Sequence, residues 1–493
     1  MLVESVEFLR LDANRKLDNE RRSELGQFMT PPATARLMAS MFEAKSDTIT
    51  LLDAGAGVGS LTAAFVDELC SRDCKPQSVH ATAYEIDPTL SECLRSTLDQ
   101  CQRACEDNGT VFNSRSIERD FIEAAARELR HEMFSPIERF NSAILNPPYR
   151  KINSESETRL ILREIGVETS NLYTAFLAVV LMLLDEGGEL VAITPRSFCN
   201  GPYFKPFRKM LLETLTLRRI HVFESRQDAF RQDDVLQENI IIYGVKGGQK
   251  GNVTISSSSG PEDEYSAIRE ITYEQVVRPE DSEHFIHIVP DALGASVAER
   301  LGELYWTLRE HEVEVSTGRV VDFRATPLLR AFPEGDTVPL IYPLNFEKGF
   351  IEWPKAGGKK PQAMALLPGS DDLLVPKGTY VLVKRFTSKE ETRRVVAAVY
   401  DADRIDAERV GFENHLNYFH RKGKGIAANE SHFVLWSGRS CLKSWQDMQR
   451  WRLRSTRCMS TPRLHGPLRF WRCYPRCCCS VAVGRFSTEF TTA

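Results

Sequence analysis

A glycine-rich turn between a short apolar run and a helix-like stretch constrains the fold more than any other feature. Residues 48–52 are β-branched or apolar and end at Asp53, Ala54 to Gly59 follow, and a helical pattern begins at Ser60. Glycine tolerates positive φ, so this order predicts strand, tight turn and helix. Further strands are expected at 78–85, 111–115, 140–145, 189–194, 219–223 and 240–245. The alternation predicts an α/β fold, a Rossmann-like and mainly parallel sheet with helices on both faces and ligands at the carboxyl ends of the strands.

The 493 residues divide into four expected segments. A prior of roughly 150 residues per domain favours two or three domains. We expect an N-terminal helix over 1–24, a catalytic domain over 25–248, an α+β domain over 249–436 and an atypical tail over 437–493. The boundary near 248 rests on Gly247 and Gly248 and on the polar, turn-rich run from Ser256 to Gly260.

The tail differs in composition from the rest of the chain. Ten Arg and one Lys stand there against Asp447 and Glu489, and Cys477 to Cys479 are consecutive. A nucleic-acid-binding tail is one interpretation. We favour the other, a segment translated out of frame and mostly disordered, because it lacks helical or strand periodicity.

Composition favours a folded protein outside membranes. Hydrophobic residues at 42% and charged residues at 27% exclude fibrous and wholly disordered classes. The longest apolar run, Ala175 to Leu184, is shorter than the roughly 18 residues of a membrane span, so we expect a buried helix there. No secretory leader pattern opens the chain, and we expect a cytoplasmic protein. The net charge of −5 requires any nucleic-acid partner to meet a local basic face.

The cysteines do not predict a metal site. Two pairs have i,i+4 spacing, Cys70/Cys74 and Cys101/Cys105. Structural zinc sites more often use a two-residue gap, and helical cysteine is commonly a packing residue. We therefore expect no metal.

Two positions bear on the ligand of the glycine turn. A dinucleotide fingerprint would place its third glycine at position 60, where Ser60 stands, which argues against a pyrophosphate-binding dehydrogenase. Glu85 ends the next expected strand, where a carboxylate can accept hydrogen bonds from two ribose hydroxyls. A solvated strand end is the other interpretation of Glu85, and this motif alone leaves both open.

The sequence Asn146-Pro147-Pro148-Tyr149, directly after an expected strand, carries the most chemical information. A carboxamide is a poor base, but the side-chain oxygen of Asn146 can accept a hydrogen bond from an amino group. Proline fixes φ and lacks a donor, so the carbonyl of Pro147 can face the same amino group. Tyr149 adds an aromatic plane on which a flat base can stack. An Asn-Pro turn with an ordinary core tyrosine is the alternative.

The order of these motifs resembles that of the S-adenosylmethionine-dependent amino-group DNA methyltransferases with the gamma arrangement. The resemblance covers residues 25 to about 245, from an N-terminal motif at Gly26 to Pro32 to a late motif at Phe223 to Ile242, and it includes Asn171 to Phe176. It implies cofactor contacts from Thr30, Pro31, Asp53, Gly55, Gly57, Glu85, Asp120, Phe121 and Asn146. It implies catalytic roles for Asn146, Pro147, Pro148, Tyr149 and Phe230.

Residues 340–420 look like the recognition region of the PstI/BsuBI type of modification methylase. The likeness lies in Ile351 to Lys355, Val381 to Phe386 and His415 to His420. It implies a restriction-modification enzyme that methylates N6 of a flipped adenine, with S-adenosylmethionine as cofactor and double-stranded DNA and a separate restriction endonuclease as partners. A catalytically idle DNA-binding homologue and a protein glutamine N5-methyltransferase are the alternatives, and cytosine N4 stays open as the target.

A basic cluster in this region suits contacts with DNA phosphates. Its members are Lys384, Arg385, Lys389, Arg393 and Arg394. A solvated charged face is the alternative interpretation for any single member.

Overall fold

Two compact units make up the chain, residues 1–291 and 292–493. The structure, a computed structural model, describes residues 2–17, 29–131, 136–223, 239–261, 263, 265, 267–289, 308, 312–355, 357, 359–386 and 395–426. Several predicted features lie outside the described residues: Phe230, Lys389, Arg393, Arg394, the end of the N-terminal helix and the tail 437–493.

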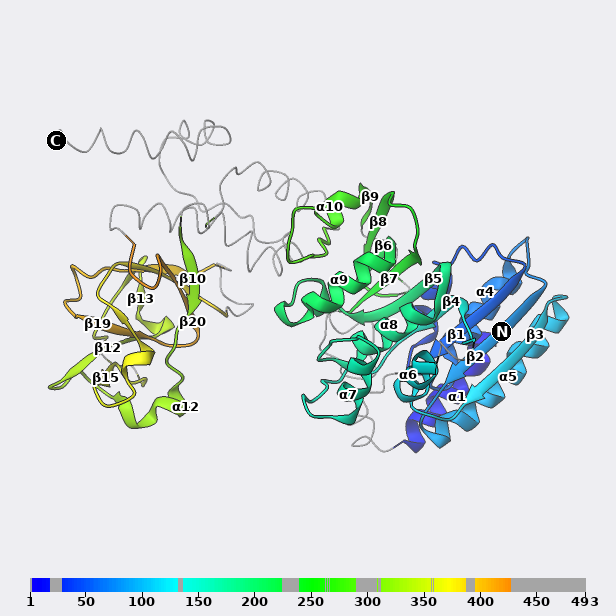
Figure 1. Ribbon diagram of the computed structural model, residues 1–493, viewed down its shortest axis with the longest axis horizontal. Coiled ribbons are helices and arrows are strands. Elements are labelled where there is room, and N and C mark those ends of the chain that lie inside the picture. The colour runs from blue at the N-terminus through cyan, green and yellow to red at the C-terminus, as the bar shows by residue number, and fades with distance from the viewer. Residues whose placement is uncertain are drawn as a thin grey trace. The chain divides into compact units, whose positions relative to one another are not determined.

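A nine-stranded sheet forms the centre of the first unit, in the order β3-β2-β1-β4-β5-β7-β6-β8-β9 (Figure 1). The strands β1 to β5 run parallel to one another. β7 pairs antiparallel with β5 and β6, β8 is parallel to β6, and β9 is antiparallel to β8. The bounds are β1 Thr48–Ala54, β2 Ser78–Tyr84, β3 Val111–Ile117, β4 Phe140–Leu145, β5 Leu184–Pro195, β6 Leu215–Phe223, β7 Asn239–Lys246, β8 Asn252–Ser258 and β9 Ala267–Thr272.

Helices cover both faces of this sheet, as the alternating pattern predicted. The helices α1, α3, α4 and α5 pack against one another and share one apolar core with β1, β2 and β7. The helices α6 to α9 form a second packed group. The bounds are α1 Leu2–Lys16, α3 Pro32–Ala39, α4 Ser60–Ser71, α5 Pro88–Asp107, α6 Phe121–His131, α7 Glu157–Glu164, α8 Leu172–Leu183, α9 Lys205–Thr214 and α10 Tyr273–Val276.

The apolar run that suggested a buried helix lies in α8 except for its last residue, Leu184, which begins β5. Every residue from Tyr173 to Leu181 is buried, which confirms that prediction. Among the described residues, no helix is both long enough and apolar enough to cross a membrane.

The first unit continues past the boundary expected near residue 248. The strands β8 and β9 extend the same sheet, and the unit ends at Asp291. Ser256 to Ser258, the first part of the polar run that suggested a turn, are buried in β8. Nδ1 of His221 lies 3.0 Å from Ser256 Oγ and Nε2 lies 3.1 Å from Ser258 Oγ. Burial lowers the pKa of His221 to about 4, so the neutral ring can bridge the two hydroxyls. Hydroxyls bonded in this way can occupy a sheet core, which apolar periodicity does not reveal.

The described part of the second unit is built mainly from strands in two sheets. One has the order β10-β20-β17-β18-β14-β13 and the other β11-β15-β12-β19-β16. The bounds are β10 Glu314–Thr317, β11 Leu329–Arg330, β12 Thr337–Ile341, β13 Phe346–Glu347, β14 Phe350–Ile351, β15 Ala363–Ala365, β16 Leu374–Pro376, β17 Tyr380–Lys384, β18 Ala397–Tyr400, β19 Arg409–Phe412 and β20 Leu416–His420. A short helix, α12, covers Asp322–Ala325. Tyr380, Tyr400, Phe412 and Tyr418 are fully buried and form the centre of one core.

Candidate active site

The loop between β1 and α4 brings main chain to the edge of the sheet. Gly57 and Gly59 have φ values of +59° and +84°, in the left-handed region that favours glycine. A Cβ added to Gly59 would lie 2.9 Å from side-chain atoms of Leu94 and Thr97, so the loop packs directly on α5. α4 begins immediately after, at Ser60. Gly55, Ala56, Gly57 and Ser60 border a cavity beside the first turn of α4.

Glu85 directly follows β2 and is held by main-chain donors. Its Oε2 accepts from Gly57 N at 2.8 Å, and its Oε1 accepts from the N–H groups of Ile86 and Asp87 at 2.9 and 2.8 Å. Burial raises the pKa of the Glu85 carboxyl group, while these three hydrogen bonds oppose the shift. The backbone thus fixes the position of this carboxylate.

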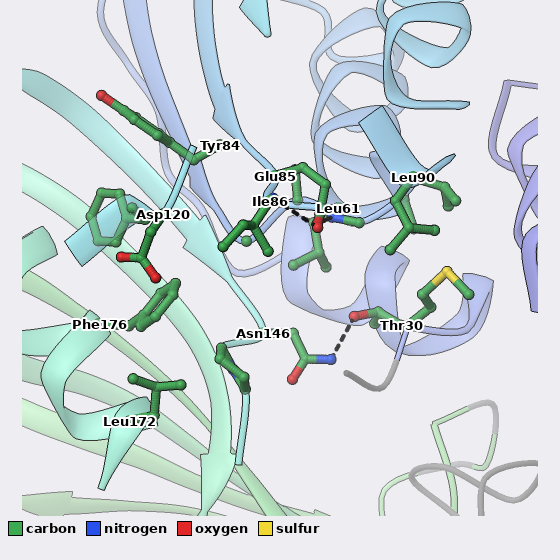
Figure 2. A pocket seen from close by; sticks show the side chains of 18 of the residues that line it. Thr30, Leu61, Tyr84, Glu85, Ile86, Leu90, Asp120, Asn146, Leu172 and Phe176 are labelled. Atoms are coloured by element: carbon green, nitrogen blue, oxygen red, sulfur yellow. Dashed lines mark hydrogen bonds between the residues drawn. The ribbon is translucent and has the colours of Figure 1, made fainter. Parts of the chain in front are cut away.

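Aromatic rings gather where β3 leads into α6. The Phe121 ring lies 5.2 Å from that of Tyr84 and 5.2 Å from that of Phe176. Asp120 precedes Phe121, and its Oδ1 accepts from Glu123 N at 2.9 Å. Figure 2 shows Tyr84, Asp120 and Phe176 on the same side of the cavity. This end offers flat apolar surfaces beside a carboxylate.

Asn146 follows β4 and lies at another part of the cavity wall. Its Nδ2 donates to Thr30 Oγ1 at 3.1 Å, the contact drawn in Figure 2. Its Oδ1 accepts from the Tyr149 hydroxyl at 3.0 Å, and that hydroxyl also lies 3.3 Å from the Ile193 carbonyl. Burial raises the pKa of Tyr149 well above its usual value, so the phenol keeps its proton. The two contacts involve both amide atoms and fix the direction in which the carboxamide faces.

One cavity at the carboxyl ends of β1 to β4 brings most predicted residues together. Parallel strands end at the same edge, so the loops that follow them meet there. The predicted residues that line it are Thr30, Gly55, Gly57, Glu85, Asp120, Phe121, Asn146 and Pro148. Those that do not line it are Pro31, Asp53, Pro147 and Tyr149, and Phe230 lies outside the described residues.

Several lining residues were given no role by the sequence analysis. They include Met29, Tyr84, Ile86, Arg119 and Phe176. Four of them directly adjoin a predicted residue, and Met29 and Phe176 lie within the motifs at Gly26 to Pro32 and Asn171 to Phe176. That adjacency and those motifs were the signals in the sequence. Periodicity alone cannot separate a residue that lines a cavity from one that packs in the core.

Asp53 lies beneath the glycine loop instead of on the cavity wall. It is fully buried, and its Oδ2 accepts from Thr62 Oγ1 at 2.7 Å. Its Oδ1 has no hydrogen-bond partner within the described part of the chain. Desolvation raises the pKa of this carboxyl group to about 7. The sequence led us to expect a direct contact between Asp53 and the cofactor. In the structure Asp53 instead connects β1 to α4 through Thr62.

Two of the predicted DNA-binding residues lie in the described part of the second unit. Lys384 ends β17 and Arg385 follows it, and Arg385 Nη1 donates to Asn414 O at 2.7 Å. No group of three or more His, Cys, Asp or Glu side chains in the described ranges could hold a metal ion.

Comparison with known proteins identifies the family. A family model described as Eco57I restriction-modification methylase matches residues 76–230. The type II methyltransferase M.PstI of Providencia stuartii is 44% identical over 422 residues, 85% of this chain and 82% of that protein. The chain belongs to the type II methyltransferases. The type II methyltransferase M.BsuBI of Bacillus subtilis is also 44% identical. The match covers 86% of the present chain and 84% of M.BsuBI. Among solved structures, the DrdV–DNA complex has a TM-score of 0.46 and 14% identity, over 86% of this chain and 53% of that one.

The family membership confirms the restriction-modification resemblance and the expected cofactor, S-adenosylmethionine. The chemical character of the residues that line the cavity also fits S-adenosylmethionine. It combines a buried carboxylate at Glu85, aromatic surfaces at Phe121 and Phe176, and an open main-chain loop at Gly57. These suit a ribose, a purine ring and an extended chain that passes close to the backbone.

Proposed function

We propose that the chain methylates the N6 amino group of an adenine extruded from duplex DNA and so protects DNA in a restriction-modification system. The observation that carries the proposal is the Asn146 carboxamide, which is held at the wall of the cavity by contacts at both of its polar atoms. An amide oxygen accepts a hydrogen bond from an amino group without removing its proton, which suits an exocyclic amine as the nucleophile.

The residues that would hold the cofactor are those that line the cavity. Glu85 is placed to accept from ribose hydroxyls, Asp120 and Phe121 to contact the adenine moiety, and Gly55, Gly57 and Thr30 to border the methionine part. When bound, S-adenosylmethionine supplies a methyl group activated by its sulfonium charge.

The target base must leave the duplex, at a cost of a few kcal/mol. Tyr149 and Phe230 are proposed to stack on its two faces, and stacking of about 1–3 kcal/mol per base offsets much of that cost. Asn146 Oδ1 and the Pro147 carbonyl would then accept hydrogen bonds from the N6 amino group and turn the nitrogen lone pair toward the methyl donor. The nitrogen that gains the methyl group gives up one of its protons to solvent. The rate gain comes from positioning and from fixed dipoles, without a covalent enzyme intermediate.

The second unit is proposed to dock the DNA. Lys384 and Arg385, together with Lys389, Arg393 and Arg394 in the same segment, would contact phosphates, and their contribution falls as salt rises. The cognate restriction endonuclease is proposed to be a separate protein.

Modification sequencing of DNA from cells that express the full chain tests the proposal. We expect N6-methyladenine at one short sequence and none in cells that express Asn146→Ala. Methylation at cytosine N4 would contradict the target base, and unmodified DNA in cells with folded wild-type protein would contradict the activity.

A further inference from the structure

Two segments of the second unit meet beside Lys384 and Arg385, the described residues proposed above to contact DNA phosphates. The turn 413–415 joins β19 to β20, and it lies beside the residues that follow β17. Arg385 N donates to His415 O at 2.8 Å, and Arg385 Nη1 donates to Asn414 O at 2.7 Å. The strands β17 and β20 are neighbours in the six-stranded sheet, with Lys384 paired to Leu416. The sheet therefore fixes the position of the side chains that emerge there.

These side chains form an exposed aromatic and cationic group, here called the Phe386–His415 surface and made of Arg385, Phe386 and His415. Phe386 is 52% exposed and the side chain of His415 is 58% exposed. Their ring centroids lie 5.7 Å apart at 65°, and Arg385 Cζ lies 5.2 Å from the Phe386 centroid. When a partner covers an exposed Phe, apolar surface is removed from water and the complex is stabilised. This arrangement therefore suits a binding surface.

A buried carboxylate sets the orientation of the exposed imidazole. The Glu413 side chain is only 3% exposed, its Oε2 accepts from His415 N at 3.0 Å, and its Oε1 is bonded to His415 Nδ1. A carboxylate only accepts, so Nδ1 carries a proton and is engaged by Glu413. The two contacts with Glu413 fix the ring so that Nε2 is the nitrogen that can face a partner.

The described cations here are Lys384 at the end of β17 and Arg385 in the surface itself, and their charge complements a polyanion. The segment 384–394 contains five Lys or Arg residues against Glu390 and Glu391. Phosphate contacts from such residues position a protein on a duplex, while side chains between them reach base edges.

We propose that the Phe386–His415 surface reads base edges in the major groove of DNA. His415 Nε2 accepts a hydrogen bond from an exocyclic amino group, adenine N6 or cytosine N4, and Phe386 packs on a thymine methyl group. The inference rests on the proposed DNA methylation and assigns part of the sequence specificity to these two side chains.

A second exposed aromatic in the same unit provides a matched control. Phe323 is 77% exposed, and Arg324 Cζ lies 5.4 Å from its ring centroid, so it repeats the Arg-over-Phe pair. Its neighbour Asp322 is an acid that is bonded to Lys360 and Tyr342, both at 2.7 Å. Phe323 therefore tests whether any exposed Phe of this unit has the same effect.

The experiment uses the full-length wild type, His415→Ala, Phe386→Ala and Phe323→Ala. The wild-type target sequence is first read by modification sequencing. Methylation rates are then measured on duplexes that carry one changed base pair each. We expect His415→Ala and Phe386→Ala each to lose roughly 5- to 150-fold of the discrimination at one or two positions, with cofactor affinity unchanged, and Phe323→Ala to match the wild type.

Three outcomes would overturn the inference. One is wild-type discrimination in both His415→Ala and Phe386→Ala. The second is an equal loss of methylation rate on all duplexes together with a DNA affinity that depends less on salt, because that result identifies phosphate contacts. The third is a loss in Phe323→Ala of the same size. A folded wild type that modifies no DNA would overturn the proposed function as well, so the two failures are distinguishable.

Discussion

Thr30 and Asn146 lie 116 residues apart in the sequence, and Asn146 Nδ2 donates to Thr30 Oγ1 at 3.1 Å. Thr30 is buried and lies two residues before α3 begins at Pro32. A hydroxyl that accepts from the amide nitrogen orients the carboxamide, because the oxygen must then point elsewhere. Figure 2 shows the Asn146 oxygen directed away from Thr30. Thr30 therefore orients the amide proposed to be catalytic, in addition to lining the cavity.

Thr30→Val should lower kcat more than it changes cofactor affinity. The substitution keeps the shape and removes one hydrogen bond worth roughly 0.5–1.5 kcal/mol, so we expect a kcat roughly 2- to 13-fold lower. Thr30→Ser should restore the rate, because serine keeps the hydroxyl. Single-turnover methylation and equilibrium cofactor binding separate the two quantities.

Thr34→Val is the matched control for that experiment. Thr34 is a fully buried threonine of α3 whose Oγ1 has no hydrogen-bond partner in the described ranges, so its removal should leave kcat unchanged. A higher KM for cofactor with wild-type kcat in Thr30→Val would instead assign Thr30 to cofactor binding alone.

Tyr149→Phe and Tyr149→Ala should separate the two roles of this side chain. The phenylalanine variant keeps a ring for stacking but loses the hydroxyl contacts with Asn146 Oδ1 and the Ile193 carbonyl. We expect it to flip the base normally and to turn over more slowly. The alanine variant should also lose most of the flipping signal, measured as the fluorescence of 2-aminopurine at the target position. Normal flipping in the alanine variant would disprove the stacking role.

The pH dependence of stability should change in Asp53→Asn. Burial raises the pKa of Asp53 to about 7, above its value of about 4 in the unfolded chain. Between these values the folded state keeps a proton that the unfolded state has lost. The contribution of Asp53 to the free energy of unfolding therefore falls as pH rises from about 4 to about 7, and it is constant above pH 7. Asparagine does not titrate, so the variant should gain stability relative to the wild type across this window.

Urea unfolding at several pH values measures the Asp53 effect as the difference between the two proteins. The pKa of Glu85 is also raised, but Glu85 is present in both the wild type and Asp53→Asn. Its effect on the pH dependence therefore cancels when the two proteins are compared. A constant difference from pH 4 to 7 would show that Asp53 is ionised in the folded state.

The sequence predicted elements best where local pattern and tertiary burial agree. The strand β4, Phe140–Leu145, was expected with the observed bounds, because the apolar residues 143–145 end directly at the Asn-Pro-Pro turn. The strand β8 was missed because its buried serines depend on His221, which lies 35 residues earlier. No local signal reports a hydrogen-bond partner of that kind.

The site could be predicted as a set of loops but not as a set of contacts. Motif order placed Glu85, Asp120 and Asn146 at one sheet edge, where the cavity lies. It could not show that Asp53 faces α4 or that Thr30 contacts Asn146, because both depend on how the loops fold back on the sheet.

Gly59→Ala should cost more stability than Gly109→Ala, although both glycines have positive φ, +84° and +76°. A left-handed conformation costs an alanine roughly 1–2 kcal/mol at either site. At Gly109 a Cβ meets nothing within 4 Å, whereas at Gly59 it meets Leu94 and Thr97 at 2.9 Å. Overpacking there adds roughly 1–3 kcal/mol and displaces the loop from α5. Gly59→Ala should therefore also weaken cofactor binding, measured by calorimetry, while Gly109→Ala binds normally. Equal unfolding free energies in the two variants would show that the loop does not need its close packing on α5.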